Sequence, residues 1–136
     1  MFSDHKTRLV RLVLALSLLA AANARTAYAA DVPDAMDAGW KGEKRCENLH
    51  EDEHIRVLRC TFPPNVGHEP HSHPASFLYV LTGGHGKVTD SNGVREFEVK
   101  TDQSRPAKPV EWHEMLNTGD STLRYLIVEK KYQFDK

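Results

Sequence analysis

The stretch that decides the fold is Gly67-His68-Glu69-Pro70-His71-Ser72-His73-Pro74. Side chains two residues apart lie on the same face of an extended strand, so His71 and His73 share a face. Two imidazoles on one face can reach a single metal ion at the distance of about 2.0–2.1 Å that a zinc–nitrogen bond needs. The chain has eight histidines, however, and such a pair also arises by chance on exposed strands. A second feature is needed to decide between these readings.

That second feature is a third histidine further along the chain, in Pro109-Val110-Glu111-Trp112-His113-Glu114-Met115-Leu116-Asn117. An apolar segment, 77–81, and a turn at Asn92-Gly93 lie between the two histidine-bearing stretches. An Asn-Gly pair between strands predicts a tight hairpin, because both central turn residues need a positive φ. The spacing therefore predicts two histidine-bearing strands separated by a strand and a hairpin.

The rest of the chain also favours short strands. Segments rich in β-branched and aromatic residues follow one another from Lys44 onward, separated by glycine, proline and asparagine. The expected strands are 55–62, 77–81, 87–89, 94–99, 112–116 and 123–128. Ahead of them, 31–42 reads as an arm with one helical turn, anchored by Trp40. Many short strands and no long helical period predict an all-β sandwich or barrel.

The two histidine motifs together resemble those of the cupin superfamily. There, a His-x-His motif precedes an apolar strand and a glycine, here Gly83, and the second motif is a histidine, three residues and an asparagine, here His113 and Asn117. The resemblance extends over about residues 47–130. It implies a single-domain cupin β-barrel (a double-stranded β-helix, or jelly roll) with one divalent metal ion on His71, His73 and His113. It favours Fe(II), with Zn, Mn, Ni and Cu as alternatives.

The chain departs from the family pattern at the usual fourth ligand. The first motif normally carries a glutamate after His-x-His, and the two positions considered for it hold Ser76 and Phe77. A divalent ion on three neutral imidazoles keeps more positive charge and more open positions. Such sites resemble those of the iron-dependent thiol and diketone dioxygenases among cupins. Glu69, His68 and Glu111 could replace the ligand, but loop residues of these types are usually exposed, and we expect that here.

Several functions stay open. The resemblance favours a mononuclear metal-dependent, dioxygenase-like enzyme that acts on a small organic molecule. No catalytic residue is evident, and Tyr79 and Ser76 are only weak candidates for contacting a substrate. The alternatives are a non-catalytic periplasmic cupin that binds a metal or small ligand, and a metal-dependent lyase or isomerase. Some cupins hold no metal, but buried histidines without an ion would be costly.

The apolar lining of the barrel depends on which strand face points inward. Under one choice it consists of Phe77, Tyr79, Leu81, Met115 and Trp112 or their neighbours. A bulge between His73 and Tyr79 would change that choice, so the parity stays open. An apolar lining with few polar groups suits a small organic ligand.

The first residues have the pattern of an export signal. Lys6, Arg8 and Arg11 precede the apolar run 12–22, and Ala27-Tyr28-Ala29 supplies the small residues of a cleavage site. The run is shorter than the roughly 20 residues that span a bilayer, although an uncleaved anchor remains the alternative. We expect a signal peptide over 1–29, an N-terminal arm over 30–43 and a cupin domain over 44–136, in a periplasmic or secreted protein.

Charge and cysteine content bear on partners and redox state. The leader has a net charge of +3 (four basic residues against Asp4), so the chain's −1 becomes −4 without it. An acidic domain lacks the positive surface that nucleic acids and anionic membranes require. We expect a small-molecule ligand, no nucleic acid, no membrane contact after cleavage and, by analogy, a homodimer. Cys46 and Cys60 flank an expected turn, so a cross-strand disulfide and two buried thiols are both open.

Overall fold

The computed structural model describes residues 32–132, and the expected signal peptide over 1–29 lies outside them. These residues form strands, turns and loops without a helix, which confirms the all-β prediction. In this part of the chain, no helix is long and apolar enough to cross a membrane. The strands are β1 (Gly39–Trp40), β2 (Glu43–Lys44), β3 (Cys46–Glu51), β4 (Ile55–Phe62), β5 (Gly67–His73), β6 (Ser76–Thr82), β7 (Gly84–Asp90), β8 (Gly93–Val99), β9 (Ser104–Ala107), β10 (Val110–Asn117) and β11 (Leu123–Lys130).

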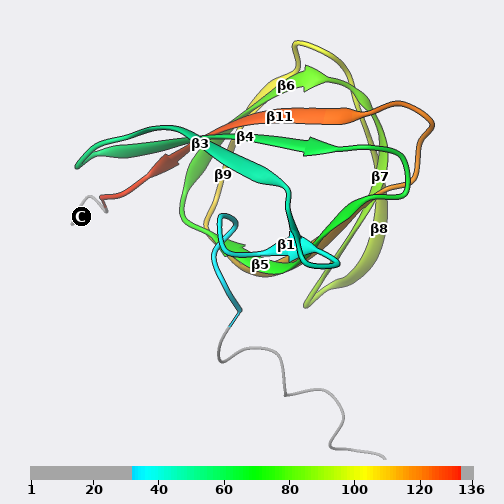
Figure 1. The fold of residues 1–136 in the computed structure, drawn as a ribbon, viewed down its shortest axis with the longest axis horizontal. Coiled ribbons are helices and arrows are strands. Elements are labelled where there is room, and N and C mark those ends of the chain that lie inside the picture. Colours follow the sequence, from blue (N-terminus) through cyan, green and yellow to red (C-terminus); the bar gives the residue numbers. More distant parts are fainter. Residues whose placement is uncertain (1–31, 133–136) are drawn as a thin grey trace, which may run out of the picture. The chain divides into compact units, whose positions relative to one another are not determined.

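Two antiparallel sheets enclose the interior of a jelly-roll barrel. One has the order β3-β4-β11-β6-β9 and the other β5-β10-β7-β8, while β1 and β2 form a separate ribbon. Figure 1 shows β4, β6 and β11 along one side and β5 along the other, with β7 and β8 closing one end. Strands adjacent in sequence, such as β4 and β5, belong to different sheets, so the chain passes repeatedly between them.

The register of the five-stranded sheet arranges its inner side chains in rows. Alternate residues of a strand share one face, and residues paired across strands lie side by side on that face. Leu78 of β6 pairs with Ile127 of β11 on one side and with Arg105 of β9 on the other. The three neighbouring rows are Glu129–Ser76–Ala107, Ile127–Leu78–Arg105 and Tyr125–Val80.

The structure decides which face of β6 points inward, a choice that the sequence leaves open. Val80 is buried at 1% exposure, whereas Phe77 is 44% exposed and the Tyr79 hydroxyl donates a hydrogen bond to Asp102 outside the cavity. Of the two choices, the one that lines the cavity with Phe77, Tyr79 and Leu81 is therefore excluded. The inward faces belong to Ser76, Leu78 and Val80, because a shift of one residue at the start of a strand reverses every face.

The β7–β8 hairpin is confirmed, but its turn differs from the expected one. Asp90 pairs with Gly93, so the loop consists of Ser91 and Asn92. Within residues 90–93, Gly93 is the residue with a positive φ, of 104°, and the Asp90 carboxylate accepts a hydrogen bond from the Asn92 N–H. The positive φ thus falls on the residue after the turn, where glycine adopts it without a steric penalty.

A disulfide joins Cys46 of β3 to Cys60 of β4, so in this structure the two residues form a cross-strand disulfide and are not buried thiols. Both cysteines are buried and belong to the core cluster around Leu58, Phe62 and Leu123. A crosslink that closes a loop of this length stabilises the fold by about 3 kcal/mol through the unfolded state.

The arm ahead of the barrel packs on β5. Asp34 forms a bridge with Ser72, and its carbonyl accepts hydrogen bonds from the N–H groups of Asp37 and Ala38, which makes a single turn. The Trp40 ring lies against Gly67, where a Cβ would come within 2.7 Å of a ring carbon. Glycine at this position therefore lets the arm approach the strand that carries His71 and His73.

Candidate metal centre

The structure brings together the three histidines that the motifs single out. His71 and His73 project from β5, and His113 comes from the neighbouring strand β10, where it pairs with His71. The Nε2 atom of His71 lies 3.0 Å from Nε2 of His73 and 2.9 Å from Nε2 of His113. One ligand atom from each residue lies within 4.8 Å of the other two, as a shared ion requires.

The other ring nitrogens determine which tautomers are present. Nδ1 of His71 lies 2.7 Å from the Glu69 carbonyl oxygen, and Nδ1 of His73 lies 2.7 Å from Oε1 of Glu129. Both oxygens can only accept, so each Nδ1 carries the proton and each neutral ring has its lone pair on Nε2. Two lone pairs 3.0 Å apart repel each other unless a proton or a cation lies between them. The donor set therefore fits a metal ion.

The spacing of the nitrogens also fits. Two nitrogens bound at about 2.1 Å to one ion and at right angles to each other lie about 3.0 Å apart. The two short Nε2 separations around His71 match that value. Three imidazoles arranged in this way leave further coordination positions of an ion for other ligands.

Burial keeps the imidazoles in the form that binds metals. Burial, together with the neighbouring imidazoles, lowers the pKa of His71 to about 2 and that of His113 to about 4. These rings are neutral near pH 7, and a metal ion does not have to displace a proton from them.

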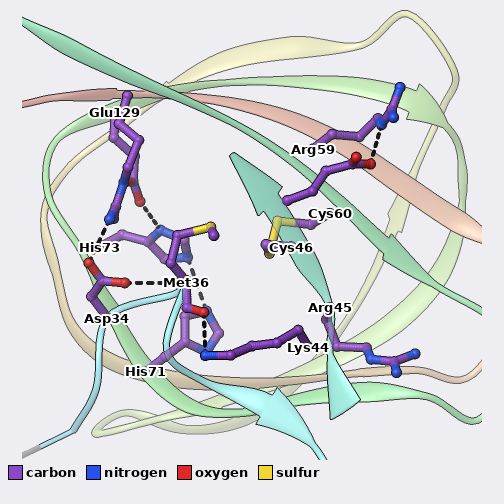
Figure 2. Close-up of a disulfide and its surroundings, with 12 residues drawn as sticks. Asp34, Met36, Lys44, Arg45, Cys46, Arg59, Cys60, His71, His73 and Glu129 are labelled. Atoms are coloured by element: carbon purple, nitrogen blue, oxygen red, sulfur yellow. Dashed lines mark hydrogen bonds and ion pairs between the residues drawn. A yellow bond between two sulfur atoms is a disulfide. The ribbon is translucent and has the colours of Figure 1, made fainter. Parts of the chain in front are cut away.

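A buried carboxylate supports His73 from the opposite sheet. Glu129 of β11 is 1% exposed, and its second oxygen accepts a hydrogen bond from Nε of Arg56 at 2.7 Å and lies 2.6 Å from Nη2 in an ion pair. Nη1 of Arg56 donates in turn to Asp34 of the arm at 2.8 Å. Figure 2 shows Glu129, His73 and His71 in succession, with Asp34 beside them. A carboxylate on the far nitrogen of a ligating histidine orients the ring and raises its basicity.

Glu129 also places a carboxylate beside the position where the family motif usually has its glutamate. Ser76, at one of the two candidate glutamate positions, is buried and pairs with Glu129 on the inner face. Phe77, at the other, points to solvent. A carboxylate is thus present beside this position, but it comes from the next strand and contacts His73 instead of reaching the Nε2 atoms. Sequence reasoning missed it because the expected last strand ended at Val128, although Leu123, Tyr125, Ile127 and Glu129 alternate on one face.

The three residues considered as replacement ligands, Glu69, His68 and Glu111, do not belong to the group of ligand atoms around the candidate metal position. Glu69 is exposed and accepts a hydrogen bond from the Lys41 N–H, and Glu111 is exposed too, as expected. His68 is 2% exposed, so the prediction of an exposed residue is wrong. The cause is a bulge: two residues of β5 stand opposite one of β10 between the pairs His71–His113 and His68–Met115.

The bulge stacks His68 on the metal centre. The ring centroids of His68 and His71 are 3.8 Å apart, and burial lowers the pKa of His68 to about 4. Its Nε2 is the one buried side-chain polar atom of the described residues without a hydrogen-bond partner. His68 is therefore a neutral ring that supports His71 and does not belong to the group of three.

The histidines line a cavity of about 650 Å³ between the two sheets. Its walls combine polar residues with apolar ones, the latter being Leu78 and Ile127 on the five-stranded sheet and Val88, Phe97 and Met115 on the other. Met115 lines the cavity as expected, whereas Trp112 does not. A volume of this size is typical of sites for small organic ligands.

Comparison with known proteins agrees with this architecture. The sequence model of the cupin domain matches residues 58–129, more than half of the chain, so the protein belongs to the cupin family. The matched segment includes the three histidines and Glu129. A search of curated proteins finds no significant match.

Solved structures share the fold at low identity. A cupin domain from Bordetella pertussis Tohama I has a TM-score of 0.61 at 17% identity, over 75% of this chain and 98% of that one. A cupin-like protein from Thermotoga maritima MSB8 has a TM-score of 0.53 at 20% identity, over 67% and 71% of the two chains. A protein with a double-stranded β-helix domain from Klebsiella pneumoniae has a TM-score of 0.52 at 20% identity, over 64% and 77%.

Proposed function

We propose that the protein is an exported, metal-binding cupin that acts on a small organic molecule as a mononuclear, dioxygenase-like enzyme. The observation that carries the proposal is the convergence of three imidazole nitrogens at the wall of a cavity that also has apolar side chains. A ferrous ion bound there would supply Lewis acidity and the capacity to bind dioxygen.

The protein's own contribution is the environment of that ion. Glu129 holds the proton on Nδ1 of His73 and thereby keeps Nε2 free to bind. Leu78, Val88 and Phe97 surround an organic molecule with apolar groups and exclude water from its reacting end.

Metal analysis tests the first half of the proposal. Protein purified from its native compartment should contain one equivalent of a divalent metal, and His113→Ala should lose it. His85→Ala, which changes an exposed histidine, is the matched control and should keep the metal. Unchanged metal content in His113→Ala would refute the site.

Oxygen uptake tests the second half. Iron-loaded protein is mixed with a panel of diketones, thiols and flavonols, and oxygen consumption is recorded. At least one compound should cause uptake that His113→Ala abolishes. No uptake with any compound, in any metal form, contradicts the dioxygenase-like activity.

A second candidate is a periplasmic binding module without turnover. Tyr79 points away from the cavity and Glu129 is engaged by His73 and Arg56, so neither is free to act as a base. The same placements weigh against lyase or isomerase chemistry. A ligand that is bound and recovered unchanged supports the binding module, and a product formed without oxygen supports a lyase or isomerase.

A further inference from the structure

Arg105 of the edge strand β9 is exposed and lines the cavity on the sheet opposite the one that carries the three histidines. It lies in register with Leu78 and Ile127, whose side chains line the cavity, and it lines the cavity itself. Within residues 32–132 its guanidinium has no ion pair and no side-chain hydrogen bond. An arginine on the inner face of a barrel without a protein partner is available to a ligand.

A tyrosine lies one row from Arg105 on the same inner face, two strands away on β11. Tyr125 is in the next row of the same inner face, is 7% exposed and lines the cavity. Burial raises the pKa of Tyr125 to about 12, and the positive charge of Arg105 opposes this increase. The hydroxyl stays protonated at physiological pH and can donate a hydrogen bond.

The remaining charges around the cavity are also mainly positive. Arg95 and Lys108 line it together with one acidic residue, Glu98. Arg95 is paired with Asp90 at 2.7 Å, so among the described residues that line the cavity, Arg105 and Lys108 are the arginine and lysine side chains without an ion pair. This positive lining contrasts with the acidic composition of the domain as a whole and favours an anionic ligand.

We propose that the cavity binds a small organic acid, with its carboxylate on Arg105 and Tyr125 and a second donor group at the three histidines. The planar guanidinium matches a carboxylate with two parallel hydrogen bonds, and the tyrosine adds a third donor. This inference rests on the proposed metal site, because that site defines the other end of the ligand.

The register gives the offset between the two ends of such a ligand. The Arg105 row is one step, about 6.6 Å, along the strands from the Glu129 row, and β9 lies two strand spacings, about 9.6 Å, from β11. Glu129 contacts His73, so the length of the ligand is tested with a series of acids.

Dicarboxylates of increasing length are suitable probes. Malonate, succinate, glutarate and adipate, each with its monomethyl ester, are titrated calorimetrically into metal-free and Co²⁺-loaded protein. At least one diacid should bind, and Arg105→Gln should weaken its binding about ten-fold or more, as expected for loss of a charged hydrogen-bonding partner. Tyr125→Phe should weaken it less, and Arg105→Lys should restore part of the loss.

Arg124→Gln is the matched control, because Arg124 lies beside Tyr125 on β11 but on the other face. It should leave the dissociation constants unchanged, and thermal unfolding verifies that every variant is folded. Equal binding by Arg105→Gln and the parent protein, or no diacid bound by the parent, overturns the proposal. If Co²⁺ does not bind at all, the proposed function fails, and the effect of Arg105→Gln on diacid binding to metal-free protein still decides this inference.

Discussion

Replacement of Glu129 by glutamine is the sharpest test of how the barrel prepares its histidines. The substitution keeps the size of the side chain but removes the charge that holds Nδ1–H of His73 and two N–H groups of Arg56. Loss of a carboxylate partner of a ligating histidine lowers metal affinity 10- to 100-fold, about 1.4–2.7 kcal/mol. Glu129→Gln should therefore bind Co²⁺ more weakly by that factor.

The stability of the metal-free protein should change separately. Removing one partner of a buried ion pair costs about 3–5 kcal/mol. Arg56 is 16% exposed as a side chain and keeps Asp34, and the amide can still accept a hydrogen bond, so we expect about 2 kcal/mol. Urea unfolding of metal-free protein measures this term.

Competitive titration of Co²⁺ against a chelator, with its visible absorption spectrum, measures the affinity and the ligand geometry. Glu47→Gln is the matched control, since it removes a carboxylate that pairs with Arg59 at 2.6 Å on the exposed face of the same sheet. It should leave the affinity and the spectrum unchanged. A Glu129→Gln protein with the parent's Co²⁺ affinity and spectrum would show that the carboxylate does not prepare His73.

Three further predictions concern pH, the disulfide and the leader. Burial lowers the pKa values of His68, His71 and His113. These three rings therefore gain protons in the unfolded chain but not in the folded one as the pH falls through 6.5. The metal-free protein should lose about 2 kcal/mol for each ring between pH 7 and pH 5 in urea unfolding, whereas equal stability at both values would contradict the buried neutral rings. Reduction of Cys46–Cys60 should destabilise the fold by about 3 kcal/mol, seen as a lower unfolding temperature, and an unchanged temperature under full reduction would count against it. Mass spectrometry of protein from the native host should find a chain that starts at Ala30, and an intact Met1 would refute cleavage at that site.

Local sequence patterns were enough to predict the class of fold and the three central histidines. Alternation and turn residues predict strands wherever they are strong, as in 55–62, which corresponds to β4. His71 and His73 share a face because they are two residues apart in one strand, and this holds whatever that strand pairs with. The local sequence Asn92-Gly93 likewise predicts the hairpin, but it did not predict that the positive φ lies on Gly93 alone.

Tertiary structure decided everything that depends on which strand lies beside which. The inward face of β6 follows from its register with β11, and a slip of one residue would have put Tyr79 inside in place of Leu78. The bulge opposite β10 buries His68, and no local pattern reports it. The same holds for the contacts of Glu129 with His73 and Arg56, since these residues meet only when β11 and β4 close over β5. The sequence by itself determined the ligating side chains, whereas the tertiary structure determined what orients them and what faces them, because pairing between distant strands leaves no periodic signal in either strand alone.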